Sequence, residues 1–143
     1  MLTIKQIVEN YDNYKTFLDD RLGVRLCQFL NDEQMEKIGF EYNLAEGEKR
    51  PTVVPFTEEN VLKQLKEDVA FGIEKAVGHR GISASLMHSV CLGWCAILEN
   101  GLDELYEHDY GWYGDKLFKA IDKKYNFGLI NENTFDKKFY EEW

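Results

Sequence analysis

The stretch ISASLMHSVCLGWCAIL, residues 82–98, contains no Asp, Glu, Lys or Arg and decides the fold. Around it, residues 1–77 hold fifteen acids and ten bases, and residues 99–143 hold eleven and six. Seventeen residues that include serines, a histidine and a glycine are too short and too polar to span a membrane. The stretch therefore predicts a buried helix through the centre of the protein. Much of the circumference of this helix would be occupied by Leu86, Met87, Val90, Cys91, Trp94, Cys95, Ile97 and Leu98.

A second long helix is predicted just before this one. It covers residues 58–77, begins after the cap residue Thr57 and ends at Gly78, because glycine readily leaves the helical conformation. The central helix is predicted to begin at the cap Ser83 and to end at Gly101. Three- and four-residue spacing predicts an inward face for the first helix, made of Val61, Leu62, Leu65, Val69, Ile73, Ala76 and Val77.

The N-terminal forty residues are predicted to be mostly helical. Apolar residues repeat at helical spacing over residues 4–19. A short helix is predicted between Asn31 as its cap and Gly39 as its end. Residues 21–30 fit either a helix or one face of a strand, and we favour the helix.

A small β-hairpin is predicted between these helices and the long pair. FEYNL, residues 40–44, and TVVPF, residues 52–56, have the composition of short strands and flank a polar turn. Two strands alone are marginal in water, so the hairpin should pack against helices or join another chain's sheet. The predicted fold class is thus mainly α (α+β), a single-domain helical bundle over residues 1–143 with a small β-hairpin.

The C-terminal part is predicted to hold a short helix, an aromatic loop and an amphipathic helix. The buried face of that amphipathic helix would be Leu117, Phe118, Ile121 and Tyr125. Aromatic side chains of the loop and the tail are candidates for a protein-interaction surface: Tyr110, Trp112, Tyr113 and Trp143. The alternative is that the loop aromatics cover an edge of the core.

The turn GHRGISAS, residues 78–85, is the candidate site for a small anion. A guanidinium, backbone amides and hydroxyls there would lie near the positive end of a helix dipole, which suits a phosphate or a nucleotide. The candidate ligand-binding residues are His79, Arg80, Gly81, Ser83 and Ser85. The alternative is a tight interhelical turn in which the glycines allow the bend and Arg80 pairs with a surface acid.

The sequence offers little support for metal or thiol chemistry. One stripe of the central helix carries His88, Cys91 and Cys95, to which Cys27 could add a fourth zinc ligand. This spacing is no known zinc signature and buried cysteines are common, so we expect core packing and no metal or cofactor. A hydrolase or thiol enzyme that uses His79, His108 or a cysteine is a third interpretation, for which no activated nucleophile is evident.

The protein is acidic, with a formal net charge of −9. This charge disfavours direct binding to nucleic acid and favours a protein partner with a basic surface. Three cysteines at no disulfide spacing and a polar N-terminus without a signal peptide predict a cytoplasmic protein. The free hairpin edge and the aromatic tail would also allow a homo-oligomer.

Four stretches together suggest a resemblance: LDDRLGVRLCQFL, VPFTEENVLKQLKEDVAFGIEKA, GHRGISASLMHSVCLGWCAILENGL and YGWYGDKLFKAIDKKYNFG. In these stretches the chain resembles small uncharacterised proteins encoded by phages and prophages of Gram-positive bacteria. The resemblance implies no residue roles, but it implies binding to a host component, as anti-CRISPR and other anti-defence proteins do. Our first hypothesis is therefore a non-enzymatic protein that binds and inhibits a host defence or nucleic-acid-processing protein. The alternative is a small-ligand binder that sequesters a phosphorylated or nucleotide signal through Gly78–Ser85.

Overall fold

A computed structural model describes residues 1–11, 20–40, 44–49, 52–79, 82–100 and 116–130. The protein is mainly helical, as predicted, and no β-strand lies among these residues. The elements are α1 (Ile4–Glu9), α3 (Asp20–Leu26), the 3-10 turn η1 (Cys27–Phe29), α4 (Asp32–Lys37), α5 (Glu58–His79), α6 (Ile82–Glu99) and α8 (Lys116–Tyr125).

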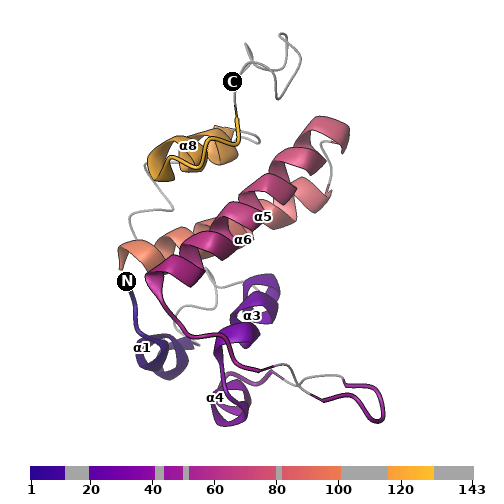
Figure 1. The fold of residues 1–143 in the computed structure, drawn as a ribbon, viewed down its shortest axis with the longest axis vertical. Helices are drawn as coiled ribbons and strands as arrows, with labels where there is room; N and C mark the ends of the chain where they lie inside the picture. Colours follow the sequence, from indigo (N-terminus) through magenta and orange to yellow (C-terminus); the bar gives the residue numbers. More distant parts are fainter. Residues whose placement is uncertain (12–19, 41–43, 50–51, 80–81, 101–115, 131–143) are drawn as a thin grey trace.

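The long helices α5 and α6 form an antiparallel pair at the centre of the structure (Figure 1). The N-terminal helices α1, α3 and α4 lie on one side of this pair, where α3 contacts α6 and α1 contacts α4. Helix α8 lies on the other side and packs on α5. The described buried side chains from all these helices join in one hydrophobic cluster, which α6 crosses.

The prediction that α6 is the central buried helix is confirmed. Its buried residues lie around most of the helical circumference: Met87, Val90, Cys91, Gly93, Trp94, Cys95, Ala96 and Ile97. Such a helix buries apolar surface against neighbours on several sides, which stabilises the fold by about 25 cal/mol per Å² removed from water. Gly93 lets α3 approach closely, because a Cβ there would overlap the side chain of Leu22.

The inward face of α5 is largely as predicted. Val61, Leu65, Val69 and Ile73 are buried, whereas Leu62 is half-buried. The side chains of residues 76 and 77 lie outside the described part. Two residues that the apolar pattern did not include, Asp68 and Gly72, are also buried on this helix.

The N-terminal predictions are confirmed in part. Residues 21–29 are helical through α3 and η1 and Leu30 is extended, so the helix was the correct choice over the strand. Helix α4 is capped by Asn31, whose side chain accepts a hydrogen bond from the amide of Gln34, and Gly39 follows it with a φ of 76°. Helix α1 begins where the predicted helix does but ends at Glu9, with Asn10 as its C-cap, so the predicted helix of residues 4–19 is interrupted; residues 12–19 lie outside the described part.

The predicted β-hairpin is wrong for the part that the structure describes. Residues 52–56 form no strand but run back across the N-terminal helices. The amide of Val54 donates to the carbonyl of Gln28 at 2.8 Å, and the ring of Phe56 meets Phe29 edge to face at 5.3 Å. Pro55 has no amide hydrogen to offer a ladder. The apolar residues of this segment therefore pack onto η1. Residues 41–43 of the other predicted strand lie outside the described part.

Helix α8 confirms the predicted amphipathic helix, with Leu117, Phe118 and Ile121 buried on α5. The chain then reverses through Asn126 and Gly128, which both adopt positive φ. The buried carboxylate of Asp122 accepts hydrogen bonds from the backbone amides of residues 129 and 130, which follow this reversal, at 2.8 and 3.1 Å. Among the described helices, none combines the length and the apolar character needed to cross a bilayer.

Candidate functional site

The predicted anion-binding turn is shorter than the sequence suggested. Helix α5 continues through Gly78 to His79, and α6 already begins at Ile82, so Gly78 does not end a helix. Glycine within a helix costs about 1 kcal/mol, which the packing of a long helix readily offsets. Only residues 80 and 81 separate the two helices, and they lie outside the described part.

Ser83 is not the cap of α6, because a capping residue precedes the first helical residue and Ser83 follows it. Ser85 also lies within the first turn and a half of α6. The structure places the backbones of His79, Ser83 and Ser85 on helices but does not describe their side chains. At the other end, α6 stops at Glu99 and the left-handed conformation is taken by Asn100, with a φ of 55°, one residue before the predicted Gly101.

The predicted interaction aromatics lie outside the described residues. This holds for Tyr110, Trp112, Tyr113 and Trp143, and also for His108. The proposals about these side chains therefore stay predictions.

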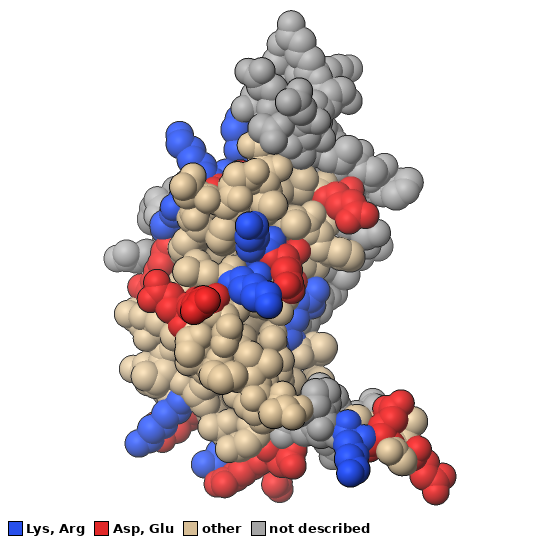
Figure 2. Space-filling model, in the orientation of Figure 1, with Lys and Arg blue, Asp and Glu red and all other residues tan. Residues whose placement is uncertain are grey.

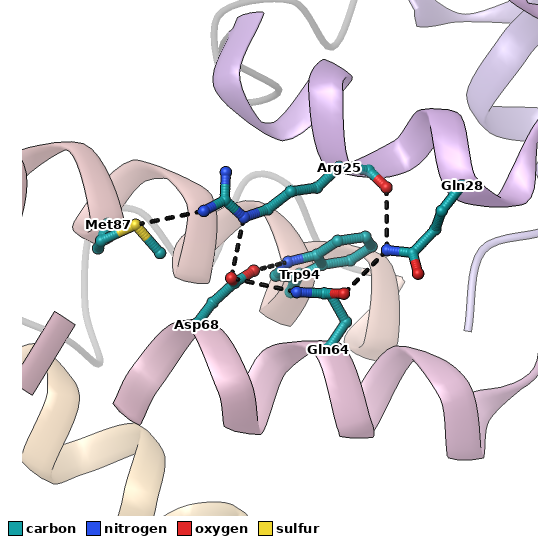
Figure 3. Close-up of polar contacts among 6 residues, drawn as sticks. All are labelled: Arg25, Gln28, Gln64, Asp68, Met87 and Trp94. Atoms are coloured by element: carbon teal, nitrogen blue, oxygen red, sulfur yellow. Dashed lines mark hydrogen bonds and ion pairs between the residues drawn. The ribbon is translucent and has the colours of Figure 1, made fainter. Parts of the chain in front are cut away.

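The structure instead brings together a polar cluster that the sequence reading missed (Figure 3). At its centre lies Asp68 of α5, which is 4% exposed. One carboxylate oxygen accepts from Nε of Arg25 at 2.9 Å, and the other accepts from Nε1 of Trp94 at 2.7 Å. Gln64 donates a further bond at 3.2 Å. A single carboxylate thus links α3, α5 and α6, and we call this group the Asp68 cluster.

Two further contacts extend the Asp68 cluster. Gln28 of η1 donates to the side-chain oxygen of Gln64 at 2.9 Å and to the carbonyl of Arg25 at 3.0 Å. Nη2 of Arg25 points to the sulfur of Met87 on α6, at 3.7 Å. The Arg25 side chain is 31% exposed, so one edge of the guanidinium reaches solvent while the other neutralises the buried acid.

The cysteines pack in the core, as predicted. Cys27, Cys91 and Cys95 are buried free thiols, and Cys27 donates to the carbonyl of Gly23 at 3.1 Å. Burial raises the pKa of Cys91 well above its usual value; Cys95 and Asp68 raise it further, and Arg25 lowers it. Among the residues that the structure describes, no three His, Cys, Asp or Glu side chains are grouped so as to hold a metal ion.

The buried thiols should be chemically silent in the native protein. At pH 8 we expect an aromatic disulfide reagent to label the native chain at least about 100-fold more slowly than the denatured chain, because labelling requires opening of the core. A reaction with native cysteines as fast as with denatured ones would contradict the observed burial.

The raised pKa of Cys91 also predicts a pH dependence of stability. The folded protein retains the Cys91 proton to higher pH than the unfolded chain does. The contribution of this thiol is therefore complete below the unfolded pKa, about 8.5, and is lost as pH rises through the folded value. In urea titrations, the free energy of unfolding should fall more steeply above pH 9 in the wild type than in Cys91→Ala. Equal slopes would contradict the prediction.

Charge on the surface is uneven among the described residues. Helix α4 and the loop of residues 44–49 expose five acids: Asp32, Glu33, Glu36, Glu46 and Glu48. We call these residues the acidic end. Two exposed lysines, Lys37 and Lys49, lie among them. In Figure 2, acidic and basic groups both project from the lower part of the face in view, where Figure 1 shows α4 and the loop of residues 44–49.

The Asp68 cluster did leave a signal in the sequence. Val61, Leu65, Asp68 and Gly72 follow one another at intervals of three or four residues, so an acid stands within an apolar stripe. Such an acid needs a buried partner, and a tryptophan on the neighbouring helix can donate to it. Which arginine reaches it depends on tertiary structure.

Comparisons with protein-family models, with curated proteins and with solved structures found no match to this chain.

Proposed function

We propose that the protein acts without catalysing a reaction, by binding and inhibiting a host protein that presents a basic surface. The partner we favour is a defence or nucleic-acid-processing protein in the host cytoplasm. A basic channel in such a protein attracts the negative phosphates of nucleic acid. An acidic protein surface is also negative, so it can occupy the same channel in place of the phosphates. The phage-type resemblance of the sequence agrees with a partner from a host cell.

The observation that carries the proposal is the acidic end. Five acids are exposed there against two lysines, and Lys37 lies 3.8 Å from Glu33 within the same helix. An exposed ion pair of this kind is weak and screened by solvent, so it leaves most of the negative potential intact. A partner with lysines or arginines would gain from this potential in both association rate and orientation.

The interior supports a binding role over a catalytic one. Both oxygens of the Asp68 carboxylate already accept hydrogen bonds from within the fold. The described thiols are buried, and a raised pKa keeps Cys91 protonated. A catalytic acid, base or nucleophile must reach its substrate in an active protonation state, which these groups do not.

Capture from a host lysate, followed by reconstitution with the purified partner, tests this proposal. We expect a captured protein that binds nucleic acid and loses it when this chain is added. Raising salt from about 50 to about 300 mM should release the complex, because exposed charges are then screened. A purified partner whose nucleic-acid binding stays unchanged would contradict inhibition. Heat protection by a nucleotide that Arg80→Ala abolishes would favour the small-ligand alternative instead.

A further inference from the structure

We infer that two polar rungs between the N-terminal helices and α5 set the register in which those helices dock. The first rung is Arg25–Asp68, with 2.9 Å between Nε and Oδ1. The second is Gln28–Gln64, with 2.9 Å between Nε2 and Oε1. Both rungs belong to the Asp68 cluster, and Figure 3 shows them side by side.

The spacing of the rungs matches on the two helices. Gln28 follows Arg25 by three residues, whereas Gln64 precedes Asp68 by four, so the rungs stand about one helical turn apart on each side. The opposite order means that α3 and η1 run antiparallel to α5, as Figure 3 shows. Because the two intervals agree, both rungs form together in one register.

Apolar packing alone defines this register poorly. The buried residues of α3, Leu22 and Leu26, belong to the apolar core cluster, and Leu22 lies against Gly93 of α6. Apolar burial has no preferred direction, so a slip by one turn exchanges one such contact for another. Hydrogen bonds are directional, and a slip would leave the Asp68 carboxylate buried without its arginine, which is strongly unfavourable. Single buried polar residues fix register in coiled coils in the same way.

The fit of Leu22 over Gly93 offers a competing explanation, since it also joins α3 to the long pair. A variant that removes both rungs separates the two explanations. Arg25→Met/Gln28→Leu/Gln64→Leu/Asp68→Leu leaves no unpaired ion and keeps Leu22 and Gly93 intact. Its matched control is Lys66→Met/Glu67→Leu, which removes one exposed charge of each sign from α5.

Amide NMR spectra and helical circular dichroism provide the readout. We expect the test variant to keep its helicity while the amide peaks of residues 20–29 double or broaden, and the control to give one sharp set. A single sharp set in the test variant would overturn the inference and assign the register to Leu22 and Gly93. If the test variant does not fold, Arg25→Met alone should double the peaks of α3 and leave those of α5 and α6 unchanged. If the test variant and Arg25→Met both unfold, the inference is also overturned, because the Arg25–Asp68 rung would then supply stability and not register.

Discussion

Asp68→Ala is expected to lower the free energy of unfolding by about 3 kcal/mol. The substitution removes the carboxylate that joins Arg25 and Trp94, and it leaves the indole N–H buried without this acceptor. Arg25 can turn partly to solvent, which keeps the expected loss near the lower end of the range for broken buried ion pairs. Urea denaturation followed by circular dichroism measures this loss.

Glu67→Ala provides the matched control for that measurement. Glu67 is the neighbouring acid on α5 and is exposed, so its removal should change stability by less than about 0.5 kcal/mol. Asp68→Asn should fall between the two, because it keeps an oxygen acceptor but loses the charge. Equal stabilities of Asp68→Ala and Glu67→Ala would show that the Asp68 cluster does not hold the three helices together.

Gly72→Ala is expected to lower the free energy of unfolding by about 2 kcal/mol. The same change in an open helix would raise stability by up to about 1 kcal/mol. Here a Cβ would overlap the ring of Phe118, which is fully buried where α8 packs on α5. His88 lies against the same ring, 4.6 Å away between centroids, so the ring has little room to move. Chemical denaturation at equilibrium measures the change.

A double-mutant cycle identifies the cause of that loss. Phe118→Leu removes the ring atoms that the new methyl group would meet. In this background Gly72→Ala should be neutral or stabilising, because only the helix propensity of alanine remains. If Gly72→Ala destabilises the protein equally in both backgrounds, overlap with Phe118 is not the reason.

Periodicity predicted the helices well because each one buries an apolar stripe. The central helix α6, the inward residues of α5 and the buried face of α8 all follow this pattern. The caps also followed local chemistry: Thr3 with Gln6 forms a capping box, and Asn31 caps α4. These features depend on residues within one or two turns, which a sequence displays directly.

The errors arose where tertiary packing overrides local preference. Gly78 lies within α5 because a long packed helix tolerates glycine, and residues 52–56 pack on η1 in place of pairing as a strand. The Asp68 cluster joins residues 43 and 26 positions apart in the chain, so its partners become evident only in the fold. For the predicted anion site, the backbone shows a two-residue connection and helical serines, which removes the capping argument for Ser83.

The measurement that tests the proposed function most directly is the dissociation constant for the reconstituted partner in two matched charge variants. Glu36→Gln/Glu46→Gln neutralises two exposed acids of the acidic end, and Glu67→Gln/Glu74→Gln neutralises two exposed acids of α5. We predict at low salt that the first variant binds about tenfold more weakly than the wild type, whereas the second binds like the wild type. Equal affinities of the two variants and the wild type, unchanged by salt, would contradict a binding role for the acidic end.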